Sequence, residues 1–391
     1  MTADSRQLRE RYLAGARRLV VKVGTNVLTS PGLPLDRSRV GALGDQIAAL
    51  VRDGRQVALV TSGAIGAGMG ALGLTSRPHT LPGLQAAASV GQGLLVALYD
   101  EALRRRGLHA GQILLTRDDF DARDRYLNAS NTIHHLFSLD CVPVINENDT
   151  VSTDEIKFGD NDLLAALVTH MIRAEALILL TSVPGLQTTT PPPAAVLSVH
   201  EGAREGRAVA DVVSGVDPEV MGLVRSDKTS LGLGGMGSKL EAVRIAVEAG
   251  EAAVIADGKQ PDTLIRLMAG EPVGTLFLPA ERRLQSRKRW IRFTGRPRGG
   301  IVVDEGARRA LCESGKSLLP SGVLDVEGEF GPGDIVRIST ADGRVFARGL
   351  TNYSSDDVHR IKGLNSSRIQ PVLGHKCYDE VVHRDNLALL A

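Results

Sequence analysis

Cys141-Val-Pro-Val-Ile145 leads into Asn146-Glu-Asn-Asp149, and Gly159-Asp-Asn-Asp162 leads into Leu163-Leu-Ala-Ala-Leu-Val168. The first apolar run predicts a buried strand and the second predicts a helix, so polar residues stand where a strand ends and a helix begins. Open α/β sheets place their ligand sites at such points. Taken alone, each cluster is equally well explained as a turn followed by a helix N-cap, since Asp and Asn are favoured in both positions.

Segments with strand and helix patterns alternate from residue 18 to about 280, which predicts a mainly parallel sheet with helices on both faces. The expected strands are 19–23, 57–60, 113–115, 141–145, 176–180 and 253–256, and the expected helices are 40–51, 84–106, 126–139, 163–168 and 238–249. The Thr/Pro tract over 188–193 is incompatible with a helix or a central strand and predicts a surface loop.

The character of the sequence changes after residue 280. A stretch rich in Arg and Lys is followed by short apolar runs at 301–303, 334–338 and 344–348, which lie between Gly-rich turns. This pattern predicts a small β-rich domain. We therefore expect a first domain over 15–280, a basic linker over 281–297 and a second domain over 298–380.

Composition and charge exclude several classes of protein. The 391 residues carry a net charge of +1 and only 3% aromatic residues, which argues against RNA binding through charge or base stacking. The sequence contains no run of 18 apolar residues, so it predicts no membrane span. The first ten residues are polar and lack the apolar core of a signal peptide. Cys141, Cys312 and Cys377 fit neither a disulfide framework nor a zinc site, so we expect a cytoplasmic protein with reduced thiols.

Lysines and glycines at the strand ends are candidate anion-binding groups. Lys22 lies within an apolar strand, where an ammonium is costly unless it meets an anion or extends to solvent, and Gly24 permits close approach of a phosphate. Gly-rich turns at 61–68 and 232–239 each precede a helix. Neither turn has Walker A or dinucleotide-binding spacing. Lys239 lies in the first turn of its helix, where the helix dipole disfavours a cation unless a phosphate is bound there. The alternative is a solvated lysine on a flexible loop.

Two lysines, two Gly-rich turns and an acidic cluster are the groups that phosphoryl transfer requires, because that reaction depends on positioning and charge neutralisation. No general base stands out. A carboxylate acceptor needs none, since it is ionised near pH 7. No Ser/His/Asp order and no His/Glu metal-ligand spacing is present.

The sequence resembles the glutamate 5-kinase family of amino-acid kinases. The motifs that carry the resemblance are Val20-Val-Lys-Val-Gly-Thr25, Val60-Thr-Ser-Gly-Ala-Ile65, Val144–Asp149, Gly159–Asp162 and Gly234–Lys239. The segments Gln85–Gln92, Leu114–Arg117 and Arg287–Trp290 also look like the family. Segments 303–306, 317–320 and 383–385 look like the PUA domain of bacterial members. The resemblance implies a three-layer α/β amino-acid-kinase fold with a mainly parallel central sheet, followed by a small β-rich PUA domain.

The resemblance also implies an activity. It is phosphorylation of the side-chain carboxylate of L-glutamate by ATP to give L-glutamyl 5-phosphate, the first step of proline synthesis. Mg²⁺ would be carried by ATP rather than by protein ligands. Proline as a feedback inhibitor and a homo-oligomeric assembly are further expectations from the family.

The site residues follow by matching motifs. Lys22 and Lys239 would grip the transferring phosphoryl group, and Asp162 would orient both lysines. The residues implied in glutamate binding are Ser62, Gly63, Ala64, Asp149, Asp160 and Asn161. The residues implied in ATP binding are Lys22, Gly24, Thr181, Ser182, Leu233, Gly234, Gly235, Met236, Gly237, Ser238 and Lys239.

Several nucleotide-side positions depart from the family pattern. Ser182 stands in place of Asp, Gln187 in place of Tyr, Leu233 where Thr is common, and the Thr/Pro tract replaces an Asp-Pro segment. Two alternatives to glutamate phosphorylation remain open. One is a kinase of the same fold that acts on aspartate, acetylglutamate or a nucleotide. The other is RNA binding through the PUA domain, which the basic linker favours and the near-zero net charge opposes.

Overall fold

A computed structural model describes residues 3–30, 35–152, 161–189, 191–200, 208–225, 235–280, 291–292, 296–376 and 378–390. The chain divides into two compact units, Met1–Arg283 and Leu284–Ala391. Three of the residues predicted to form the site, Asp160, Leu233 and Gly234, lie outside the described residues, as do Cys377 and most of the basic linker.

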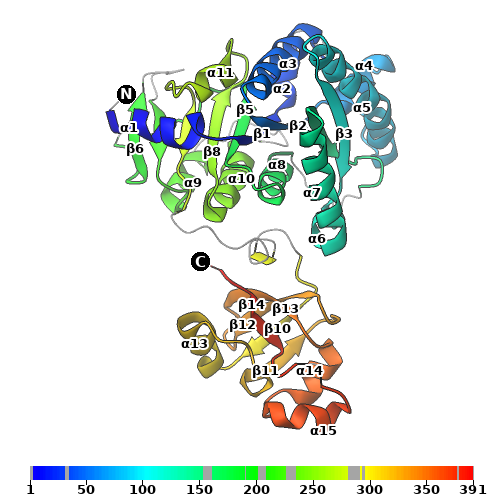
Figure 1. The fold of residues 1–391 in the computed structure, drawn as a ribbon, viewed down its shortest axis with the longest axis vertical. Coiled ribbons are helices and arrows are strands. Elements are labelled where there is room, and N and C mark those ends of the chain that lie inside the picture. The colour runs from blue at the N-terminus through cyan, green and yellow to red at the C-terminus, as the bar shows by residue number, and fades with distance from the viewer. Residues whose placement is uncertain are drawn as a thin grey trace. The chain divides into compact units, whose positions relative to one another are not determined.

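The first unit is built on a nine-stranded sheet in the order β3-β4-β2-β1-β5-β8-β9-β7-β6 (Figure 1). Its strands are β1 (Arg18–Val23), β2 (Gln56–Thr61), β3 (His109–Leu115), β4 (Cys141–Glu147), β5 (Ala176–Thr181), β6 (Val196–His200), β7 (Val209–Val213), β8 (Ala252–Asp257) and β9 (Thr275–Phe277). Strands β1 to β5 and β8 pair in parallel, which confirms the predicted sheet. Antiparallel pairs join β9 to β8 and β6 to β7, an edge that the sequence did not predict.

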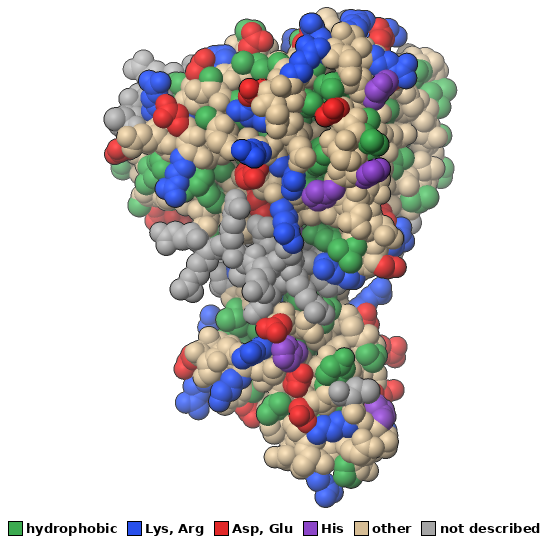
Figure 2. All heavy atoms as spheres, viewed as in Figure 1, with side chains coloured by type: hydrophobic (Ala, Val, Ile, Leu, Met, Phe, Trp, Pro, Cys, Tyr) green, Lys and Arg blue, Asp and Glu red, His purple; other side chains and the backbone are tan. Residues whose placement is uncertain are grey.

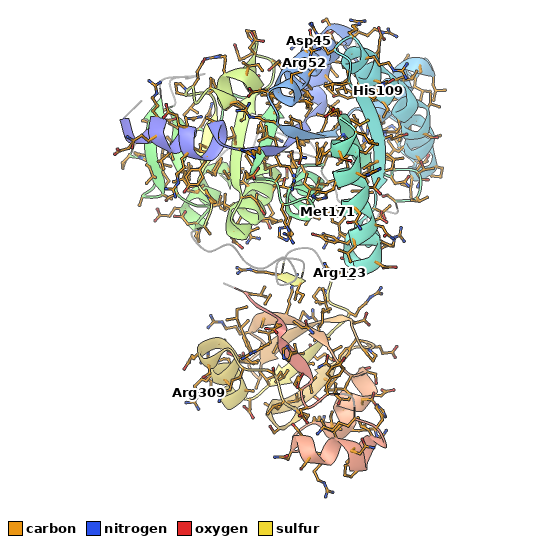
Figure 3. All side chains as sticks on the ribbon, viewed as in Figure 1. Asp45, Arg52, His109, Arg123, Met171 and Arg309 are labelled. Carbon is orange, nitrogen blue, oxygen red and sulfur yellow. The ribbon has the colours of Figure 1, made fainter. Side chains whose placement is uncertain are left out.

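Helices cover both faces of this sheet. They are α1 (Ala3–Arg9), α2 (Thr25–Leu28), α3 (Arg37–Arg52), α4 (Ala64–Ala71), α5 (Leu81–Arg104), α6 (Arg117–Asp121), α7 (Arg123–Ser138), α8 (Asn161–Met171), α9 (Pro218–Arg225), α10 (Met236–Ala249) and α11 (Thr263–Met268). Figure 3 marks Asp45 and Arg52 on α3 and Met171 at the end of α8.

Alternation along β1 sets the two faces apart. Leu19, Val21 and Val23 belong to the same buried core as residues of α3 and α5. Lys22 points the other way, because successive strand residues face opposite sides of a sheet, and it meets α8. Helices α8 and α10 pack against each other on that second face. The sheet thereby delivers one lysine of β1 to the face covered by α8 and α10.

The chain's first helix is anchored by a buried arginine. Arg9 Nη2 lies 2.7 Å from Asp211 Oδ1 on β7, and neither side chain is exposed. The guanidinium also donates to the carbonyls of Val273 and Gly274. Burial lowers the pKa of Arg9, while the Asp211 carboxylate opposes that shift. A five-residue π-helix, Glu10–Ala14, then leads into β1.

Helices α4 and α5 cross at two glycines. A Cβ added at Gly68 would lie 1.8 Å from the carbonyl oxygen of Ala87, and one added at Gly91 would lie 1.8 Å from that of Ala64. Such distances are impossible for real atoms, so both positions require glycine. Because Ala64 begins α4, the close approach ties the first turn of α4 to α5.

Helix α5 is also the one helix among the described residues that is long and apolar enough to cross a membrane, with a mean hydropathy of 1.3. Length and composition alone give this result, and buried helices of globular domains share both properties. One face of α5 packs in the core against α3, α4 and β3.

The second unit is a five-stranded sheet in the order β11-β10-β12-β13-β14. Its strands are β10 (Gly299–Val303), β11 (Val323–Glu327), β12 (Ile335–Thr340), β13 (Val345–Thr351) and β14 (Val382–Leu389), and its helices include α13 (Glu305–Ser314), α14 (Ser355–Ile361) and α15 (Ile369–Leu373). The predicted β-rich character of this part of the chain is confirmed. Its helices supply Leu311, Val358 and Ile361 to a separate core, which the sequence reading had not anticipated.

Two further expectations concern the surface. Thr188 is buried at 6% exposure and its N–H donates to Ala208 O, so the predicted surface loop begins one residue later than expected. On the visible face of each unit, described Lys and Arg side chains are interspersed with Asp and Glu rather than gathered into one basic patch (Figure 2).

Candidate active site

Two lysines share one aspartate at the carboxyl ends of the central strands. Lys22 Nζ, from β1, lies 2.6 Å from Asp162 Oδ1 in the first turn of α8. Lys239 Nζ, from the first turn of α10, lies 2.9 Å from Asp162 Oδ2. The three side chains are 4%, 7% and 0% exposed in the order Lys22, Lys239, Asp162. The alternative readings of both lysines as solvated side chains are therefore wrong.

Charge in this cluster favours an anionic ligand. The three groups by themselves sum to one excess positive charge, and a buried positive charge favours an anion beside it. A phosphoryl group beside the two ammonium groups would offset that charge. The shared carboxylate also holds the two like-charged groups on its opposite oxygens, so they are positioned before a ligand arrives.

A cluster of amides adjoins the lysines. Asn161, next to Asp162, donates through Nδ2 to Thr61 O at 2.9 Å, to Ser62 Oγ at 3.1 Å and to Asn146 Oδ1 at 2.8 Å. These contacts join the ends of β2 and β4 to the start of α8. The two clusters that decide the sequence pattern, 146–149 and 159–162, are thus brought into contact through Asn146 and Asn161.

Glycines cap two helices that begin at this edge. Gly63, with φ of 107°, precedes α4, and Gly235 precedes α10. Glycine offers no side chain to the first backbone N–H groups of a helix, so those groups of Ala64 and of Met236, Gly237 and Ser238 can face an anion. Ser238 Oγ donates back to Gly235 O, which holds the turn closed.

Gly24 contributes differently from the expectation. Its N–H donates to Leu180 O at 3.2 Å, so that N–H is engaged within the sheet. A Cβ at this position would lie 3.8 Å from Lys22 Nζ. Gly24 therefore contributes by having no side chain, which leaves space beside the Lys22 ammonium group.

The remaining predicted residues lie around these clusters. Asp149 is half-buried in the turn after β4, which is held by Ser152 Oγ donating to Glu147 Oε1 at 2.9 Å.

Thr181 ends β5 opposite Asp257 of β8, and Ser182 follows it, half-buried. Within the described residues, neither Thr181 nor Ser182 makes a side-chain hydrogen bond to Lys22, Lys239 or Asp162. Gln187 pairs with Val209 in an isolated antiparallel bridge.

One contributor was missed by sequence reasoning. Gln92, on α5, is 8% exposed and accepts a hydrogen bond on Oε1 from Asn146 Nδ2 at 2.8 Å. Gln92 ends the segment 85–92, which the family resemblance includes, but the motif match assigned it no role. Across the described part of the chain, no group of three or more His, Cys, Asp or Glu side chains is placed to hold a metal ion.

Comparison with known proteins adds independent information. Residues 17–257 match the model of the amino acid kinase family, and residues 299–373 match the PUA domain. The chain is 46% identical to a glutamate 5-kinase of Syntrophotalea carbinolica, over 98% of this chain and 100% of that protein. It is 47% identical to a glutamate 5-kinase of Geobacter sp. strain M21, over the same shares. A solved carbamate kinase from Giardia lamblia, bound to AMP-PNP, overlaps 68% of this chain and 100% of that one, with 16% identity and a TM-score of 0.47.

Proposed function

The chain belongs to the amino acid kinase family, and we propose that it acts as a glutamate 5-kinase. It transfers the terminal phosphoryl group of ATP to the side-chain carboxylate of L-glutamate, which gives L-glutamyl 5-phosphate for proline synthesis. One structural observation carries the reaction type: two buried lysines share one buried aspartate at the carboxyl edge of a parallel sheet. The acceptor follows from relatives of that name that match the chain over nearly its whole length.

Phosphoryl transfer in this site rests on charge and position. Lys22 and Lys239 contact the transferring group from two sides, and Asp162 keeps their ammonium groups in place. The developing negative charge then meets cations that need no rearrangement. No general base takes part, because the attacking carboxylate is already ionised.

The acceptor binds beside the amide cluster. Ser62, Gly63 and Ala64 bind the carboxylate being phosphorylated through one hydroxyl and the N–H groups at the start of α4. Asp149 pairs with the α-ammonium, and Asn161 adds a neutral polar contact. Asp160 is part of the same proposal by its place in the sequence motif.

The nucleotide binds on the other side of the lysines. The family uses ATP, and Gly235, Met236, Gly237 and Ser238 at the start of α10 are the proposed phosphate contacts, together with Leu233 and Gly234 before them. Thr181 and Ser182 complete the nucleotide side, and Gly24 leaves it space. We assign Mg²⁺ to the ATP phosphates, where it would neutralise their negative charge.

The wider organisation is part of the proposal. We propose a kinase domain over 15–280, a linker over 281–297 and a PUA domain over 298–380, supported by the two compact units and the two family matches. A cytoplasmic, homo-oligomeric enzyme inhibited by proline fits its relatives' biosynthetic role.

A trapping assay tests the function. Purified protein with Mg-ATP, L-glutamate and hydroxylamine should give glutamyl hydroxamate, because hydroxylamine captures an acyl phosphate before it cyclises. Omission of glutamate, ATP or Mg²⁺ should each abolish the product. Parallel reactions with L-aspartate and N-acetyl-L-glutamate test the rival acceptors. A product with either rival and none with glutamate would overturn the proposal.

A further inference from the structure

Gln92 lies behind the amide cluster and outside every assigned role. It comes from α5, a helix that the proposed function does not use, and its only described polar contact is with Asn146. Both side chains are buried, at 8% and 2% exposure. A buried amide with one partner is unusual, since most buried polar groups are fully satisfied.

The hydrogen bonds of this cluster have a direction. Asn146 Oδ1 accepts from two donors, the backbone N–H of Glu147 at 2.9 Å and Asn161 Nδ2 at 2.8 Å. Its Nδ2 must therefore point toward Gln92, and Gln92 must present its oxygen. Reversal of either amide would place two N–H groups against each other.

This direction leaves the Gln92 amide nitrogen buried without a partner among the described residues. The unsatisfied Gln92 N–H groups destabilise the fold, and this is the cost of presenting an acceptor to Asn146. The same direction decides what Asn161 offers. Its Nδ2 faces Thr61 O, Ser62 Oγ and Asn146 Oδ1, so its Oδ1 makes no hydrogen bond within the described part of the chain.

We infer that Gln92 is a positioning residue for the acceptor site, acting through Asn146 to set the orientation of the Asn161 amide. This inference rests on the proposed function. With Asn161 held this way, its Oδ1 faces the ligand as an acceptor, which suits the α-ammonium of an amino acid. Ser62 Oγ accepts from Asn161, so its own proton is directed to an acceptor such as a ligand carboxylate.

Helix α5 supports the same edge at a second point. Tyr99, two helical turns after Gln92, shares a hydrogen bond of 3.1 Å with Thr61 Oγ1. Burial raises the pKa of Tyr99 well above its ordinary value, so the phenol stays neutral. The polar side chains of α5 thus reach the ends of β2 and β4 from behind, without entering the ligand site.

Steady-state kinetics of Gln92 variants test the inference. Gln92→Met keeps the volume and removes the acceptor, so the KM for L-glutamate should rise about tenfold while the KM for ATP changes less than about twofold. Gln92→Glu keeps an oxygen toward Asn146 and should restore most of the glutamate affinity. Gln92→Asn withdraws the amide by one methylene and should resemble Gln92→Met; it serves as the second variant if Gln92→Met does not fold.

The control is Gln46→Met. Gln46, on α3, accepts from the backbone N–H of Leu264 at 2.9 Å, away from the amide cluster, so its loss should leave both KM values unchanged. An unchanged glutamate KM in the Gln92 variants, an equal rise for ATP, or equal damage by Gln92→Glu would overturn the inference. If the wild-type protein forms no glutamyl hydroxamate, the proposed function fails instead, and the two failures are distinguished.

Discussion

Gly91 on α5 lies so close to Ala64 at the start of α4 that a Cβ at position 91 would come within 1.8 Å of the Ala64 carbonyl oxygen. The contact joins a helix without a proposed ligand contact to the turn whose N–H groups are proposed to hold the acceptor carboxylate. We predict that Gly91→Ala forces α4 and α5 apart. The free energy of unfolding should fall by about 1–3 kcal/mol, as for other overpacked interiors. The KM for L-glutamate should rise.

Gly93 provides a matched control on the same helix. A Cβ at that position would meet no atom within 4 Å. Gly93→Ala should therefore raise stability by about 0.5–1 kcal/mol, because alanine favours the helix over the unfolded chain. Equal effects of the two substitutions would show that the helix crossing does not depend on Gly91.

Lys239→Met should lower kcat in the hydroxamate assay by about 100-fold or more, with smaller changes in both KM values, if the ammonium acts mainly on the transition state. Lys316→Ala, an exposed lysine of the second unit, serves as the control and should leave kcat unchanged. A normal kcat for Lys239→Met would remove this lysine from the proposed mechanism.

Asp149→Asn should raise the KM for L-glutamate by about tenfold or more while the KM for ATP stays nearly constant, because the change removes the charge partner of the α-ammonium. Asp140→Asn makes the same substitution before β4, at its opposite end, where φ of 53° suits asparagine. That control should leave both KM values unchanged. Parallel effects at the two positions would contradict the role of Asp149.

Arg9→Met should lower the free energy of unfolding by about 3–5 kcal/mol, because it leaves Asp211 charged and buried without its cation. The comparison is Arg106→Met, which removes an exposed ion pair with Asp45 on α3 and should change stability little. Urea unfolding of both variants measures the difference. If the two substitutions have equal effects, the N-terminal anchor contributes nothing beyond a surface contact.

Asp36, the N-cap of α3, should contribute a measurable pH dependence. Hydrogen bonds from the hydroxyls of Ser30 and Ser38 lower its pKa to about 2. A lowered pKa means that the carboxylate stabilises the fold above its ordinary pKa and that this contribution is lost as the pH falls from about 4 toward 2. The stability difference between wild type and Asp36→Asn, from urea unfolding between about pH 3 and 6, should shrink with acid. Parallel pH curves would contradict this.

The sequence predicted the parallel sheet because β1, β2, β4, β5 and β8 are short apolar runs bounded by glycine or polar residues. It predicted none of the β9-β7-β6 edge. The runs at 196–200 and 209–213 are as short and pair antiparallel with each other. They join the sheet through Val212 opposite Leu276 of β9, a contact remote in sequence that local patterns do not encode.

The sequence likewise indicated some of the site residues but not how they are arranged. Lys22 stands out because it interrupts an apolar strand, and Asp162 and Lys239 stand out because each begins a helix. Nothing local indicates that one carboxylate lies between both lysines, since that geometry needs α8 and α10 to pack together on one face. The role of Gln92 could not be predicted for a related reason, because it arises only when Asn146 of β4 meets α5.

The ion pair of Arg9 and Asp211 has a consequence for synthesis of the chain. The two residues are separated by 202 positions. At elongation rates of about 5–20 residues per second, Arg9 is synthesised roughly 10–40 s before its partner. During that interval α1 lacks its buried partner, whereas β1 can already pair with β2. Helix α1 is therefore among the last parts of the first unit to reach its final place, and translation speed sets how long it waits.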